Sequence, residues 1–205
     1  LIMCSWPRGG KNPAFKNHWQ YGYFNECMTG FEYQAAAHMI WEGLEHPDLL
    51  QNGLAVTRAI HDRYNAALRN PYNEIECSDH YSRSMASYGA YLAACGYESH
   101  GPKGHLGFAP KVRTGKTFKC AFTAAGGWGS FSREAGEKVT VAVKWGEVKL
   151  KTLGLDENGL GQGAVSASLP GRAVPCRVER NQDRAVVVFE ESVSIKAGEV
   201  LTVEV

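Results

Sequence analysis

The sequence predicts an α+β protein with helices in its first half and strands in its second half. Between residues 29 and 95, apolar side chains recur every three or four positions, a spacing typical of helices. From about residue 117 onward, apolar and polar residues alternate in short runs separated by turn residues, which is typical of strands. We therefore divide the chain into residues 1–100, a helical region, and residues 101–205, a crossing segment followed by antiparallel β-structure.

Three helices are expected in the first region. The first runs from Thr29 to Leu44, the second from about Pro47 to Leu68, and the third from Asp79, a good N-cap residue, to about Cys95. Each helix carries apolar or small residues on more than one side. Such helices cannot bury these residues alone and need neighbours to pack against.

The second region is expected to form a small antiparallel β-sandwich. Residues 138–145 and 148–153 alternate regularly, and Gly146 and Glu147 between them match a two-residue hairpin loop. Trp128, in a glycine-rich stretch, is expected to pack within a bend. Further strands are predicted at residues 119–123, 128–133, 164–169, 174–179, 184–190 and 200–205.

Composition excludes several classes of function. The 205 residues are 44% hydrophobic and 21% charged and have a formal net charge of +1, which does not favour binding to nucleic acid. No apolar run approaches the roughly 20 residues of a transmembrane helix. The six cysteines have no zinc-type spacing, so we expect reduced thiols, no metal site and no cofactor.

The start of the chain predicts a fragment. It opens at Leu1 without an initiator methionine or a signal-peptide pattern, so we expect a C-terminal part of a longer protein. The chain has no Asn-x-Ser/Thr sequon, which fits a bacterial, cytoplasmic setting, with any signal peptide lying upstream.

The polar segment at residues 70–85 is the candidate site. It contains three carboxylates, a histidine, an arginine and two tyrosines between a turn and a helix of small residues. Carboxylates accept hydrogen bonds from vicinal hydroxyls, a guanidinium donates a rigid fork, and aromatic faces stack on C–H surfaces. This combination favours a sugar, with Glu74 and Arg83 as the binding residues.

Two other interpretations of this segment stay open. Asp79 and Arg83 could be a helix cap with an ion pair four residues apart, a purely structural arrangement. A metal site built from Glu76, Cys77, Asp79 and His80 would need contiguous ligands that point in different directions at the start of a helix, which suits no common geometry.

Three segments carry a resemblance to a known family. They read NPYNEIECSDHYSRSMASYG (residues 70–89), TGFEYQAAAHMIWEG (29–43) and LAVTRAIHDRY (54–64). In order and spacing they resemble the late active-site region of glycoside hydrolase family 116, which contains bacterial β-glucosidases and non-lysosomal glucosylceramidase. The resemblance covers about residues 1–130.

The resemblance implies a fold and an activity. The fold would be an (α/α)6 toroid, of which residues 1–100 would supply the closing helices. The activity would be that of a retaining β-glycosidase whose nucleophile and acid/base lie upstream of Leu1, so this chain alone would hold no catalytic residue. Glu74 and Arg83, nine residues apart, match the family positions that bind the outer hydroxyls of glucose.

The expected partners are therefore a β-glucoside or related glycoside and the N-terminal remainder of the parent chain. The alternative is a noncatalytic carbohydrate-binding or structural C-terminal module.

Overall fold

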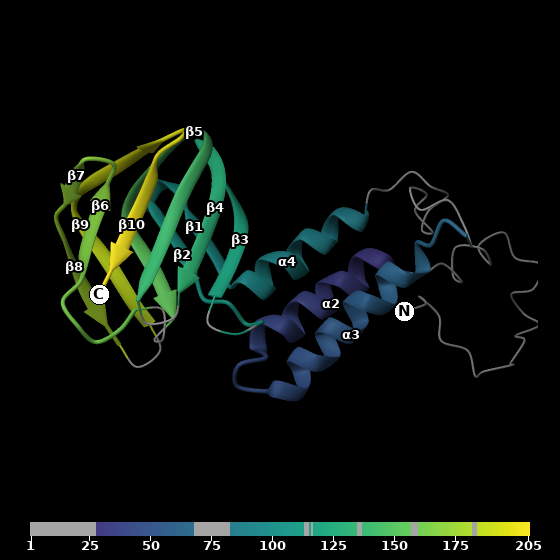
Figure 1. The fold of residues 1–205 in the computed structure, drawn as a ribbon. Coiled ribbons are helices and arrows are strands. Elements are labelled where there is room, and N and C mark those ends of the chain that lie inside the picture. The colour runs from purple at the N-terminus through teal and green to yellow at the C-terminus, as the bar shows by residue number, and fades with distance from the viewer. Residues whose placement is uncertain are drawn as a thin grey trace, which may run out of the picture. The chain divides into compact units, whose positions relative to one another are not determined.

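The computed structural model describes residues 28–67, 83–112, 115, 117–134, 137–156, 160–181 and 184–205 (Figure 1). The chain divides into two compact units, Leu1–Ala93 and Ala94–Val205. In the described residues of the first unit the secondary structure is helical, whereas strands dominate the second unit.

The first unit is built on a helical hairpin. Its described elements are α2 (Thr29–Glu42), α3 (Pro47–Arg63), the 3-10 helix η1 (Arg83–Ala86) and the start of α4 (Ser87–Cys95). Ile40 of α2 and Ile60 of α3 are fully buried. A Cβ atom added to Gly53 would lie 2.8 Å from the carbonyl oxygen of Ala36, so glycine permits the close approach of α2 and α3.

The predicted helices are partly confirmed. α2 begins at Thr29 and α3 at Pro47, as expected, but α3 ends at Arg63, short of Leu68. The third predicted helix is wrong in its first described turn, since Arg83–Ala86 is a 3-10 helix and α4 starts only at Ser87. The proposed cap at Asp79 lies outside the described residues.

The expected fold class, closing helices of an (α/α)6 toroid followed by a small antiparallel sandwich-like region, is wrong. Of the described residues, 48% lie in strands and 31% in helices, and they form three short α-helices and one ten-stranded mixed sheet. The description as an α/α barrel fails with it. The physical reason is that long runs of alternating valine, leucine and phenylalanine build a sheet with its own core, which a local resemblance over helical segments does not reveal.

The ten strands found among the described residues all belong to the second unit. They are β1 (Tyr97–His100), β2 (His105–Phe108), β3 (Thr117–Ala124), β4 (Gly127–Glu134), β5 (Lys138–Asp156), β6 (Ser166–Leu169), β7 (Arg172–Val174), β8 (Cys176–Arg180), β9 (Arg184–Lys196) and β10 (Val200–Glu204). A 3-10 turn, η2 (Gly101–Lys103), joins β1 to β2.

The pairing of these strands makes the sheet mixed. Part of the sheet has the order β1-β2-β5-β10-β6-β7. Of the other strands, β4 and β9 also pair with β5, while β3 pairs with β4 and β8 pairs with β9. β2 and β5 run parallel, while the other pairs are antiparallel.

The long strand β5 connects the two halves of the sheet (Figure 1). Residues 138–146 pair with β4 and β10, and residues 147–156 pair with β9 and β2. The predicted hairpin at Gly146 is therefore wrong. Gly146 has φ +76°, and a Cβ there would lie 2.2 Å from the carbonyl oxygen of Gly126. Glycine thus allows one strand to pass from one half to the other while lying close to its neighbour.

The core of the second unit lies between the two halves. Phe108 of β2 and Phe131 of β4 stack with ring centroids 4.0 Å apart, and both are almost fully buried. One ion pair is buried with them: Nη1 of Arg133 donates to both carboxylate oxygens of Asp156 at 2.7 Å. The core therefore holds two formal charges beside its aromatic residues.

Two further sequence-based expectations can be compared with the second unit. Trp128, expected to pack within a bend, is instead 50% exposed on β4. Among the described residues, the thiols of Cys95, Cys120 and Cys176 are free, as expected. The pKa of the Cys120 thiol is raised by the neighbouring thiol of Cys95 and by burial. No helix among the described residues is both long and apolar enough to span a membrane.

Candidate functional site

The structure describes one of the two predicted sugar-binding residues. Arg83 is the first residue of η1, whereas Glu74 lies outside the described residues, so the pairing of Glu74 with Arg83 stays a prediction. The four alternative metal ligands, Glu76, Cys77, Asp79 and His80, are outside the described residues as well.

Arg83 lies against the first turn of α2. Its guanidinium carbon is 5.9 Å from the centroid of the Phe31 ring, a cation–π distance. A Cβ added to Gly30 would lie 3.3 Å from both Cβ and Cδ of Arg83, so the glycine leaves room for the aliphatic part of the arginine. Phe31 is 51% exposed and Arg83 is half-buried, so the guanidinium lies beside an aromatic ring that is open to solvent.

Two buried contacts hold this end of α2 in place. Thr29 is fully buried, and its hydroxyl is 3.0 Å from the Tyr64 hydroxyl just after α3. Glu32, also buried, forms an ion pair with Arg63 at the end of α3. Because these contacts join the start of α2 to the end of α3, the backbone that presents Phe31 to Arg83 is restrained.

Sequence reasoning missed the part played by Gly30 and Phe31. Both belong to the segment 29–43 that carries the resemblance, but their contact with Arg83 spans more than fifty positions of the chain. No local pattern predicts such a contact. The order of the three similar segments was the only available indication that they lie together.

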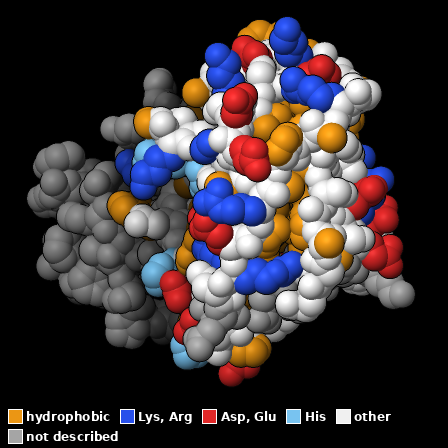
Figure 2. All heavy atoms as spheres, turned by 90° about the vertical axis from the view of Figure 1, so that its left-hand side faces the viewer, with side chains coloured by type: hydrophobic (Ala, Val, Ile, Leu, Met, Phe, Trp, Pro, Cys, Tyr) orange, Lys and Arg blue, Asp and Glu red, His pale blue; other side chains and the backbone are white. Residues whose placement is uncertain are grey.

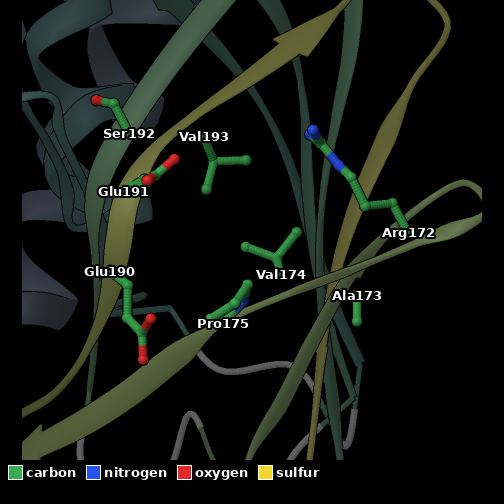
Figure 3. Close-up of a pocket in the computed structure, with 8 residues that line it drawn as sticks. All are labelled: Arg172, Ala173, Val174, Pro175, Glu190, Glu191, Ser192 and Val193. Carbon is green, nitrogen blue, oxygen red and sulfur yellow. The ribbon is translucent and has the colours of Figure 1, made fainter.

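A second candidate is a hollow of about 350 Å³ in the second unit (Figure 3). Figure 3 shows Val174 and Val193 pointing toward each other above Pro175, with Arg172 and Glu191 at the rim. The side of the molecule seen in Figure 2 has exposed hydrophobic side chains surrounded by charged ones. The buried members of the lining, Val174 and Val193, are apolar. The hollow therefore offers apolar contact, with its charged groups exposed to water.

A polar cluster joins four strands of the second unit. Arg184 of β9 donates two hydrogen bonds to Glu98 of β1, at 2.8 and 2.5 Å. His105 of β2 places Nε2 3.9 Å from Glu98 and Nδ1 2.8 Å from the Thr152 hydroxyl of β5. His105 and Arg184 hold the pKa of Glu98 at about 2, well below its ordinary value. Since Arg184 makes the two direct hydrogen bonds, whereas His105 lies beyond hydrogen-bond distance, we assign the larger effect to Arg184.

This cluster has a structural role in the sheet. Its members are partly exposed and lie above Gly107 and Gly154, where a Cβ would come within 3.3 Å of His105. Within the described ranges no group of three or more His, Cys, Asp or Glu side chains could hold a metal ion. Sequence reasoning missed the pair of Glu98 and Arg184, which are 86 positions apart.

The comparisons with known proteins add no family. No protein-family model matches the chain, and a comparison with curated proteins finds no match. The resemblance to glycoside hydrolase family 116 therefore rests on residues 29–43, 54–64 and 70–89 themselves.

Proposed function

We propose that the chain is part of a retaining β-glycosidase and that Arg83, together with Glu74, binds the hydroxyls of a glucosyl unit. The observation that carries the proposal is the arrangement at α2, where the guanidinium of Arg83 lies beside the exposed ring of Phe31. A guanidinium donates directed hydrogen bonds to sugar oxygens, and an aromatic ring covers the C–H face of a sugar.

The role of these residues is to position the substrate. In a retaining mechanism, two carboxylates about 5 Å apart act on the anomeric carbon, one as nucleophile and one as acid/base. The resemblance assigns both to sequence outside residues 1–205. Binding energy from the outer hydroxyls then orients the anomeric carbon toward those carboxylates. On this proposal the 205-residue chain does not hydrolyse glycosides by itself.

A second candidate function is a noncatalytic carbohydrate-binding or structural module. The observation that favours it is the second unit, whose ten-stranded sheet has its own buried core. This module is the alternative to the glycosidase proposal.

The test is hydrolysis of an aryl β-glucoside by the parent chain that contains this sequence. We expect Arg83→Met to lower kcat/KM by about 10- to 100-fold, since hydrogen bonds to charged groups contribute roughly 1.5–3 kcal/mol. Glu74→Gln should have a similar effect. Arg58→Met is the matched control, because Arg58 is 76% exposed and pairs only with its helical neighbour Asp62 among the contacts described for it.

The outcomes separate the candidate functions. If Arg83→Met lowers the activity no more than Arg58→Met does, the assignment of Arg83 to the sugar is wrong. If the parent chain hydrolyses neither β-glucosides nor β-xylosides, the glycosidase proposal fails and the noncatalytic module replaces it.

A further inference from the structure

Two buried cysteines lie next to each other in the second unit. Cys95 is the last residue of α4, shortly before β1, and Cys120 lies in the middle of β3. They are only 4% and 7% exposed, both are reduced, and both belong to the same hydrophobic core. A side-chain hydrogen bond joins the two thiols. The core therefore holds a pair of thiols, although residues 96–119 separate them in sequence.

Separate contacts hold β1 against β3 beside this pair. The Tyr97 hydroxyl donates a hydrogen bond of 2.6 Å to the carbonyl oxygen of Thr123, further along β3 than Cys120. The Tyr97 ring packs against Phe108, with the ring centroids 5.3 Å apart. Phe108 in turn stacks on Phe131, which is the ladder partner of Cys120. The approach of the two segments is thus held by contacts other than the thiols themselves.

The backbone around Cys95 is restrained as well. Gly96 has φ +54°, and a Cβ there would lie 1.9 Å from the carbonyl oxygen of Ala109, so only glycine fits. The Ala109 N–H donates to the Gly96 carbonyl oxygen at 3.0 Å, and the Lys111 N–H donates to the Ala94 carbonyl oxygen at 2.9 Å. The residues on both sides of Cys95 are therefore tied to the segment that follows β2.

Burial and charge decide how the pair can react. The hydrogen bond to Cys95, burial, and the negative charge that Cys95 carries when ionised all raise the pKa of Cys120. Cys120 thus keeps its proton and donates it in a hydrogen bond, and Cys95 is the thiol that ionises first and attacks an oxidant. A bulky disulfide such as oxidised glutathione cannot contact sulfur atoms this deeply buried, whereas hydrogen peroxide is small enough to reach them.

We infer that Cys95 and Cys120 are a reversible redox pair, which hydrogen peroxide converts to a disulfide between the end of α4 and β3. The sulfur of Cys95 attacks one peroxide oxygen and the O–O bond breaks, which gives a sulfenic acid at Cys95 and one water. The sulfur of Cys120 then attacks the Cys95 sulfur, and the S–O bond breaks. The hydroxyl leaves as a second water with the Cys120 proton. The thiols lose two electrons in total, and one peroxide is reduced to two waters.

The disulfide would secure an edge of the sheet. Among the described strands, β3 pairs only with β4. A bond between Cys120 and Cys95 adds a covalent link to this strand and closes a loop over residues 96–119, which restricts the unfolded chain. Oxidation therefore stabilises β3 against local opening, and a dithiol reductant reverses the effect. The pair belongs to the second unit and does not depend on Arg83.

The experiment is peroxide treatment of the folded, reduced 205-residue chain, followed by alkylation of the remaining thiols, tryptic digestion and mass spectrometry. Cys95 lies in the peptide of residues 84–103 and Cys120 in the peptide of residues 120–133, each with a single cysteine. We expect these two peptides to be joined with the loss of two hydrogen atoms and to separate in dithiothreitol. The oxidised chain should melt several degrees higher and exchange the amide hydrogens of β3 more slowly. Oxidised glutathione should not form the link in the folded chain.

Three variants test the assigned roles. Cys120→Ala should stop the reaction at the sulfenic acid of Cys95, which dimedone traps, whereas Cys95→Ala should leave Cys120 as a thiol. Cys176→Ala is the matched control, because Cys176 is a half-buried thiol of β8, and it should leave the link between the two peptides unchanged. Circular dichroism of the reduced variants checks that they are folded, and the measurement on the unsubstituted chain needs no variant.

Four results would overturn the inference. They are two thiols that are still alkylated after peroxide has oxidised Met85, which is 75% exposed, a link that forms only in urea, a link made equally fast by oxidised glutathione, and a main product that joins either cysteine to another one. Failure of the glycosidase proposal is distinguishable, because Arg83→Met should leave the link unchanged, and Cys120→Ala should leave hydrolysis of an aryl β-glucoside by the reduced parent chain unchanged.

Discussion

The buried pair of Arg133 and Asp156 offers a direct test of how the two halves of the sheet are joined. Arg133 is on β4, in the half that pairs with the first part of β5, and Asp156 is the last residue of β5, in the other half. Their side chains are only 7% and 5% exposed, and Nη1 contacts both carboxylate oxygens at 2.7 Å. The pair therefore connects the two halves through the core.

The effect of breaking the pair follows from its burial. Asp156→Asn leaves the guanidinium of Arg133 in the core without its counterion, and removing one partner of a buried ion pair costs about 3–5 kcal/mol. Replacing both residues, as in Arg133→Met with Asp156→Leu, removes both charges at once. Such replacements are often neutral or stabilising by about 1–4 kcal/mol. The double variant should thus recover the stability that Asp156→Asn loses.

The assay is urea-induced unfolding followed by circular dichroism of the β-structure, with the unsubstituted chain, Asp156→Asn and the double variant compared under the same conditions. Arg177→Met is the control, since Arg177 pairs with Glu179 at 2.7 Å but both side chains are at least 60% exposed. Exposed pairs contribute about 0–1 kcal/mol. A loss below about 1 kcal/mol for Asp156→Asn, or a double variant no more stable than the single one, would refute this reasoning.

Three further predictions concern stability. Phe131→Ala should lower the free energy of unfolding by about 3–5 kcal/mol in urea, because its ring is fully buried in the core; a loss below 1 kcal/mol would contradict this. The folded-state pKa of Glu98 is about 2 against an ordinary 4.5, so its carboxylate stabilises the fold above about pH 4.5, and this contribution is lost as the pH falls toward 2. Glu98→Gln should therefore flatten the acid side of a plot of stability against pH, and an unchanged slope would exclude that role. Gly53→Ala should lower the melting temperature despite the helix preference of alanine, because its Cβ would meet a carbonyl oxygen at 2.8 Å; a higher melting temperature would show that α2 and α3 can separate at little cost.

The sequence could predict only those residues of the candidate site that lie close together in the chain. Glu74 and Arg83 stand in one polar segment, so residue types alone suggested a sugar. The contact of Arg83 with Phe31 and the space left by Gly30 come from another helix. Similarly, Cys95 and Cys120 become neighbours only in the folded chain, because residues 96–119 separate them in sequence.

By itself, the sequence determined the local elements of this protein: the start of α2 at Thr29, the start of α3 at Pro47, and the extended character of the second half. These follow from periodicity, proline and glycine, which act over a few residues. The tertiary structure alone decided that residues 138–156 form one strand instead of a hairpin, because alternation is the same in both cases. The tertiary structure alone also decided that Arg184 pairs with Glu98 and Arg133 with Asp156, since the packing of the whole sheet brings together partners that are far apart in sequence.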